Sequence, residues 1–302
     1  MRDIASVRAA FGTPLPAPKG AVYTSAEVGG VSGEWVQART GVSDNETILL
    51  YLHGGGFVGC SARTHRPITA AFALQGLRVF VPIYRLAPEH AFPAAPQDVL
   101  AVYRALRAQA PHARITVAGD SAGGNLALGL LLTLRDAGEP LPQAAALFSA
   151  ALDMTGASPS FTLNAKHDAM FDPEELPHLT EAYLAGADPA QALASPLLGK
   201  MAGLPPMLLH VGESELLRDD SIRCQGFGGG RGPSLLVPPH RLRQERELVQ
   251  QSFSVRERFL ANGVSLNDSQ NRDLLRALVY SFWRKIVEQN IGLKAQYLLF
   301  FL

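Results

Sequence analysis

A serine between glycines stands where a predicted strand meets a predicted helix. Residues 119–123 read GDSAG; the β-rich run RITVAG ends on the first glycine, and a helical pattern begins near Asn125. Glycines let the backbone take the strained strand-to-helix turn that exposes a serine hydroxyl above a sheet. This setting predicts Ser121 as a nucleophile for acyl transfer, with a glycine-serine loop that only caps a helix as the alternative.

A second glycine-rich motif, HGGGF at 53–57, lies at the end of the β-rich run TILLYLH. Glycines here let backbone N–H groups approach a tetrahedral oxyanion without obstruction by side chains. We expect Gly55, Gly56 and Ala122 to be the donors, and we expect His53 to orient the loop through hydrogen bonds. A phosphate-binding loop is the competing interpretation, but no Lys followed by Ser or Thr comes after the glycines.

The elements that must position these motifs alternate along the chain. Continuously apolar, β-rich runs lie at 47–53, 77–84, 114–119, 144–150 and 206–212. Helical patterns occupy 64–75, 95–109 and 125–138. Strands that are apolar throughout are typical of a parallel sheet covered on both faces. We therefore expect a single α/β domain over 1–302, with a mostly parallel sheet and helices on both sides.

The segment 151–200 interrupts this alternation. It contains turns rich in Pro and Asp around one helical stretch, PEELPHLTEAYLAG. An excursion of that length between two strands is most simply a lid over the carboxyl edge of the sheet.

Composition excludes several classes of protein. Apolar residues make up 47% of the 302 residues and charged residues 18%, which argues against disorder. The longest apolar stretch, 126–134, is too short for a membrane span, and the N-terminus lacks a signal-peptide core, so we expect a cytoplasmic protein. Lys and Arg total 27, as do Asp and Glu, which indicates no nucleic-acid partner. Cys60 and Cys224 form no disulfide framework, and the spacing of His, Asp and Glu indicates no metal site.

Three motifs in combination carry a family resemblance: HGGGF, GDSAGGN (119–125) and YRLAPEHAFPAAPQD (84–98). With YLAGADPAQALASPLLG (183–199) and HVGESELLRDDS (210–221), they resemble the hormone-sensitive-lipase-like branch of the α/β-hydrolase fold, carboxylesterases mostly from bacteria. The resemblance implies Ser121 as nucleophile and the oxyanion hole already described. It also implies that about 1–20 and the 151–200 segment form a small cap over an acyl pocket.

In that family the acid of a catalytic triad follows the last strand of this series by a few residues. Its position falls on Glu215, whose role would be to hold the histidine tautomer and balance the imidazolium. Asp219 and Asp220 are rivals. They stand where a following helix is predicted to begin, and carboxylates in a first turn are explained by the helix dipole alone.

After Arg223 the chain departs from the family's pattern of an alanine-rich helix, a last strand and a histidine. Four glycines fall within 226–230, and each costs about 1 kcal/mol relative to Ala in a helix. Residues 1–223 carry 16 basic and 21 acidic groups, whereas 224–302, an atypical C-terminal region, carry 11 and 6. SLLVPP within this region would still suit a short edge strand.

His240 is the only histidine after Glu215, and two prolines precede it. The chain order Ser, acid, His makes it the candidate general base. A frame disruption or fusion after Arg223 explains the same irregular region as well, and both interpretations stay open. His65 and His90 match the family's structural surroundings of the site.

These observations together predict a serine carboxylesterase that hydrolyses short to medium acyl esters through an acyl-enzyme, without a cofactor. An inactive or ligand-binding relative and an amidase with the same triad are the alternatives. The expected partner is a small-molecule ester. The stretch 271–289 has an apolar helical face that needs burial, and a homodimer interface would bury it.

Overall fold

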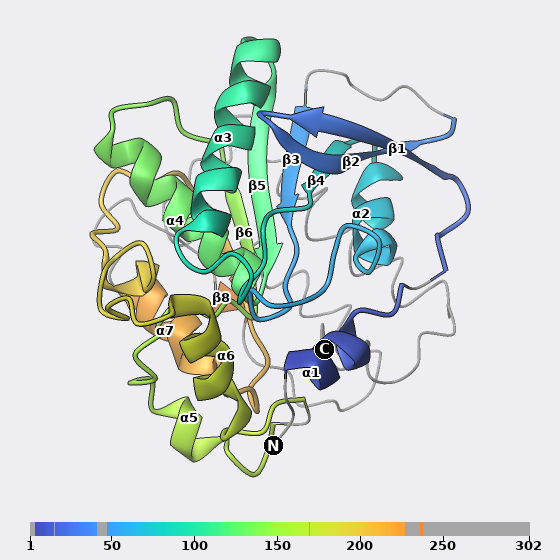
Figure 1. Ribbon diagram of the computed structural model, residues 1–302. Helices are drawn as coiled ribbons and strands as arrows, with labels where there is room; N and C mark the ends of the chain where they lie inside the picture. The colour runs from blue at the N-terminus through green and yellow to red at the C-terminus, as the bar shows by residue number, and fades with distance from the viewer. Residues whose placement is uncertain (1–3, 15, 41–46, 169, 227–235, 238–302) are drawn as a thin grey trace.

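The computed structural model describes residues 4–14, 16–40, 47–168, 170–226 and 236–237, and a twisted sheet lies at the centre of this part of the chain (Figure 1). Within it the sheet has eight strands in the order β1-β2-β4-β3-β5-β6-β7-β8. The strands are β1 (Ala21–Val28), β2 (Val31–Ala38), β3 (Thr47–Leu52), β4 (Arg78–Pro82), β5 (Arg114–Asp120), β6 (Ala145–Phe148), β7 (Met207–His210) and β8 (Leu236–Val237). The pairs from β4 to β8 are parallel, so the predicted α/β fold is confirmed.

The first two strands form an antiparallel hairpin that the sequence analysis did not predict. Gly29 and Gly30 connect them with φ of 64° and 77°. Two residues with positive φ form the turn that suits a tight hairpin, and a Gly-Gly pair between two β-rich runs is its sequence signal. β2 also pairs antiparallel with β4, which makes the sheet mixed.

Helices cover both faces of the sheet, because alternate side chains of its buried strands point in opposite directions. Ile48, Leu50 and Leu52 of β3 pack in one core cluster with apolar residues of α3 (Ala94–Gln109) and α4 (Ala122–Asp136). Leu49 and Tyr51 belong to a second cluster with residues of α2 (Arg66–Ala73). The three helices predicted between strands are therefore confirmed, and α3 and α4 lie side by side (Figure 1).

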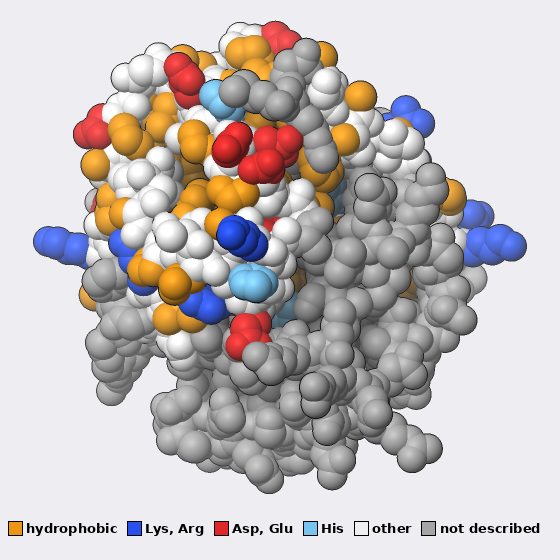
Figure 2. Space-filling view, turned by 90° about the horizontal axis from the view of Figure 1, so that it is seen from below, with side chains coloured by type: hydrophobic (Ala, Val, Ile, Leu, Met, Phe, Trp, Pro, Cys, Tyr) orange, Lys and Arg blue, Asp and Glu red, His pale blue; other side chains and the backbone are white. Residues whose placement is uncertain are grey.

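Shorter elements gather beyond the ends of β3 and β5, in the lower half of Figure 1. They are α1 (Ile4–Phe11), α5 (Ser160–Leu163), α6 (Glu175–Leu184), the 3-10 helix η1 (Pro196–Leu198) and α7 (Arg218–Gly226). Three of them, α5, α6 and η1, come from the 151–200 segment. Figure 2 looks onto this end of the molecule, where the described surface interleaves apolar side chains with acidic and basic ones.

The turn from β5 into α4 leaves no room for side chains at its glycines. A Cβ on Gly119 would lie 2.4 Å from the backbone of Gly123, and a Cβ on Gly123 would lie 1.9 Å from the carbonyl oxygen of Leu52. Both contacts are with backbone atoms, which no rotamer change can relieve. The turn is thus pressed directly against the end of β3.

Replacing Gly123 with Ala will lower the free energy of unfolding by about 2–3 kcal/mol, because backbone must move to admit the methyl group. Gly129→Ala in the same helix is the matched control. Its Cβ would meet nothing closer than 3.9 Å, so we expect a gain of up to about 1 kcal/mol. Denaturant unfolding of both variants checks this; equal effects at the two glycines would contradict the close packing.

Candidate active site

Ser121 occupies the turn between β5 and α4 in a strained conformation, with φ of 51° and ψ of −119°. Its amide donates to the carbonyl of Phe148 at 2.9 Å, and its own carbonyl accepts from Asn125 and Ala151 at 3.2 Å. These bonds fix the backbone through neighbouring segments. They leave the hydroxyl free of any helix-capping bond, which is the state a nucleophile requires.

The HGGG loop follows β3, the parallel neighbour of β5. Gly55 and Gly56 have φ of 118° and 61°, values that favour glycine. The amides of Val58 and Gly59 donate to the Gly55 carbonyl at 3.1 and 3.0 Å, which closes the loop on itself. Ala122, the other predicted donor, is the first residue of α4, where backbone N–H groups have no partner within the helix.

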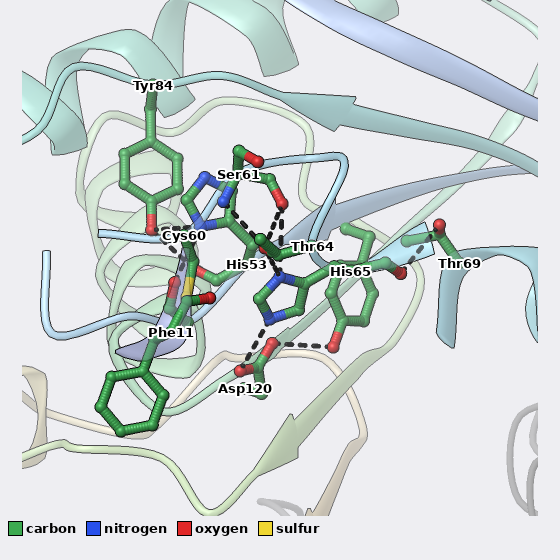
Figure 3. A network of polar contacts seen from close by, with 11 residues as sticks. Phe11, His53, Cys60, Ser61, Thr64, His65, Thr69, Tyr84 and Asp120 are labelled. Carbon is green, nitrogen blue, oxygen red and sulfur yellow. Dashed lines mark hydrogen bonds and ion pairs between the residues drawn. The ribbon is translucent and has the colours of Figure 1, made fainter. Parts of the chain in front are cut away.

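Beneath this loop lies a buried polar network centred on Asp120 (Figure 3). The Asp120 carboxylate is fully buried; it accepts a hydrogen bond from the Tyr51 hydroxyl at 2.8 Å and forms an ion pair with His65 Nε2 at 3.3 Å. Burial alone would raise the pKa of Asp120, but the His65 ring and the Tyr51 hydroxyl outweigh it, and the pKa lies below its ordinary value. Asp120 is therefore a buried negative charge one residue before the candidate nucleophile.

His53 lies in the same network and contacts the loop that it begins. Its Nδ1 lies 2.8 Å from the Gly54 carbonyl, and its ring stacks on Tyr84 at 4.3 Å between centroids. Burial lowers the pKa of His53 to about 3, so the ring is neutral at pH 7. The Gly54 carbonyl can only accept, which places the single ring proton on Nδ1. His53 thus acts as a hydrogen-bond donor to the loop.

Glu215 stands on the turn between β7 and α7. Its Oε1 accepts from the Gly212 amide at 2.7 Å. The pKa of Glu215 is raised to about 7. Burial is the largest cause and the nearby Asp168 carboxylate adds to it, whereas hydrogen bonds from Ser149 and Gly212 oppose the increase. A carboxyl in this state would be stabilised as an anion by a cationic partner, which is what a triad acid meets when its histidine is protonated.

The rival carboxylates have partners of a different kind. Asp220 is fully buried and accepts from the backbone amides of Leu152 and Asp153 at 2.7 and 3.1 Å, and from the hydroxyl of Ser158. Asp219 accepts from Arg218 Nε at 2.8 Å. Asp220 therefore ties α7 to the start of the 151–200 segment. Of the three candidate acids, Glu215 is the one whose carboxylate has its described hydrogen-bond partners, Gly212 and Ser149, just after the ends of β7 and β6.

The remaining site residue of the sequence analysis, His240, lies outside the described residues, as does the stretch 271–289. β8 falls within the predicted SLLVPP segment and pairs parallel with β7. The structure thus brings the HGGG loop, the Ser121 turn and the Glu215 turn to the carboxyl ends of β3, β5 and β7 in the parallel part of the sheet, where catalytic loops of open α/β sheets meet.

Two residues that the sequence analysis did not identify, Arg8 and Tyr183, support the HGGG loop. Arg8 of α1 donates through Nε to the Val58 carbonyl at 2.7 Å and through Nη2 to the Ala87 carbonyl at 2.9 Å. From α6, the Tyr183 ring stacks on Phe57 at 3.7 Å between centroids. A single arginine in an N-terminal segment gives no periodic signal, and an aromatic residue in a helix is more often core than support.

The described residues contain no group of three or more His, Cys, Asp or Glu side chains that could hold a metal ion. They also contain no helix that is both long and apolar enough to cross a membrane.

Comparison with known proteins gives consistent matches. The family model described as alpha/beta hydrolase fold matches residues 49–226, more than half of the chain. An acetyl-hydrolase of Streptomyces hygroscopicus is 44% identical over 224 residues, which cover 73% of each protein. The crystal structure of EstE5 soaked with ethyl alcohol superimposes with a TM-score of 0.74 at 32% identity, over 86% of this chain and 93% of that one. An esterase from the bacterial hormone-sensitive lipase family superimposes with a TM-score of 0.70 at 34% identity, over 84% and 89%.

Replacing His65 with Leu will leave the Asp120 carboxylate buried without its ionic partner. We expect a loss of about 3–5 kcal/mol in the free energy of unfolding at pH 7. In the parent, the lowered pKa keeps the stabilisation by ionised Asp120 present above about pH 4. In the variant, burial raises that pKa, so protonation relieves the penalty and the loss will be smaller at pH 4.5.

Denaturant unfolding at the two pH values checks this, with His90→Leu, which replaces an exposed histidine, as the control. A loss that is the same at both pH values, or no larger than that of the control, would contradict the buried ion pair.

Proposed function

The chain belongs to the alpha/beta hydrolase fold family, in the branch of the bacterial hormone-sensitive-lipase esterases, and we propose that Ser121, Glu215 and His240 form its catalytic triad. It is a carboxylic ester hydrolase of the serine type. The main support for the triad is the strained Ser121 turn, which is held against the HGGG loop and whose hydroxyl makes no helix-capping bond. No cofactor takes part in the proposed reaction.

The reaction follows from the site residues. His240 takes the proton of the Ser121 hydroxyl as the oxygen attacks the ester carbonyl, and the N–H groups of Gly55, Gly56 and Ala122 stabilise the oxyanion. His240 then protonates the leaving alcohol. Water attacks the acyl-enzyme by the same route, and the acid is released. Glu215 holds the imidazole in the required tautomer and balances its positive charge.

The substrate class we propose is esters with short to medium acyl chains. Leu179 of α6 stands over the oxyanion loop, with Cδ1 3.1 Å from the point where a Cβ on Gly56 would lie. An apolar side chain this close to Gly56, a proposed oxyanion donor, favours a small acyl group. The similarity to an acetyl-hydrolase supports the same class.

We propose that α1 and the 151–200 segment together form the cap of the acyl pocket, because both contact the oxyanion loop through Arg8, Leu179 and Tyr183.

The cytoplasmic location, the lack of a nucleic-acid partner and the homodimer through 271–289 stay predictions. Activity toward an activated ester distinguishes the esterase from an inactive relative. The ratio of ester to amide turnover distinguishes it from an amidase.

Hydrolysis of p-nitrophenyl acetate and butyrate by the purified chain tests the triad. We expect Ser121→Ala and His240→Ala to lower kcat by a factor of about 10⁶, and Glu215→Gln to lower it by about 10⁴. Glu213→Gln, two residues away on the same loop, is the matched control and should retain parental kcat. Parental activity in His240→Ala would show that the region after Arg223 does not supply the base.

A further inference from the structure

Three polar residues of the 151–200 segment are spaced four apart, at Ser160, Asn164 and Asp168. Backbone bonds run from Asn164 N to Ser160 O at 2.9 Å and from Asp168 N to Asn164 O at 3.0 Å, so the helical turns of α5 continue past its end. Side chains four apart on helical turns lie on one face. We call these three residues the polar face of α5.

Every residue of the polar face of α5 binds the backbone of the loop that carries Glu215. Ser160 Oγ donates to the Leu216 carbonyl at 2.6 Å and accepts from the Asp219 amide at 3.0 Å. Asn164 Nδ2 donates to the carbonyls of Glu213 and Glu215 at 2.9 and 2.7 Å. Asp168 Oδ2 accepts from the Leu216 amide at 2.7 Å.

These five bonds fix the position of the Glu215 backbone, from which its side chain extends. They hold the backbone on both sides of Glu215 and at Glu215 itself, whereas the carboxylate is held by the Gly212 amide at the end of β7. Ser160 is fully buried and Asn164 is 7% exposed, so water competes little for these bonds. A displacement of the loop by 1 Å would alter the distance between a triad acid and its histidine, on which catalysis depends steeply.

We infer that Ser160, Asn164 and Asp168 are positioning residues for the triad acid, so that the 151–200 segment sets the geometry of catalysis as well as covering the substrate. The inference rests on the proposed role of Glu215. Positioning acts on the imidazolium that forms in the transition state, so its loss lowers kcat and leaves KM unchanged.

Ser160→Ala is the first test, because the same segment offers a matched control. Ser195 is also fully buried; its Oγ donates to the Pro189 carbonyl at 2.6 Å and accepts from the Met154 amide at 2.7 Å, both within the segment. The two Ala variants lose equivalent bonds and should lower the melting temperature similarly. We expect kcat for p-nitrophenyl butyrate to fall about 10-fold in Ser160→Ala at unchanged KM, and to stay parental in Ser195→Ala. Equal kcat in the two variants would overturn the inference.

Asn164→Asp gives a second test, since it removes the donating amide at nearly constant shape. We expect a 10-fold or larger fall in kcat in the parental background and no further fall in a Glu215→Gln background, because Asn164 acts through Glu215. Additive losses would overturn the inference and leave the triad intact. Parental kcat in Glu215→Gln alone would overturn the role of Glu215, and with it the inference.

Discussion

The site depends on one steric constraint, the absence of space between the HGGG loop and the Ser121 turn. A Cβ on Gly54 would lie 2.2 Å from the Asp120 carboxylate, and one on Gly123 would fall inside the backbone at the end of β3. Because β3 and β5 are parallel neighbours, their carboxyl ends bring these two turns together. Removing side chains at the contact is what lets backbone amides and the nucleophile share one small volume. The strained φ of Ser121 is supported by this packing and by the bonds to Phe148 and Ala151.

The same closeness creates an electrostatic cost that the fold must offset. The Asp120 carboxylate is buried at the contact between the two turns, where it lies against Gly54 and has no contact with solvent. The carboxylate is paired with His65, the residue just before α2, and with the Tyr51 hydroxyl of β3. His53 lies beside it as a neutral ring. Asp120, although charged and next to the nucleophile, therefore has a structural role. Glu215 and Asp220 show a corresponding division near β7. The Asp220 carboxylate binds the backbone of the 151–200 segment, whereas the Glu215 carboxylate binds the Gly212 amide after the end of β7.

The central architecture could be predicted from the sequence because it is local. Apolar runs such as that of β3 and the glycine motifs report strands and turns within a few residues, and the five strands and three helices expected from them are present. The hairpin of β1 and β2 was missed because its strands are only partly buried and mix apolar with polar residues. The partners of Arg8 and of Asn164 were not predictable, since each bond joins residues 49 or more positions apart and depends on tertiary packing. His240 lies outside the described residues and stays a prediction.

Covalent labelling of the purified chain with an organophosphate, followed by mass spectrometry of the intact protein and its peptides, tests directly whether Ser121 is the nucleophile. We expect one adduct per chain, on the peptide that contains Ser121, and no adduct in Ser121→Ala. An adduct on a different serine, or persistent labelling of the variant, would contradict Ser121 as the nucleophile that the two glycine motifs position.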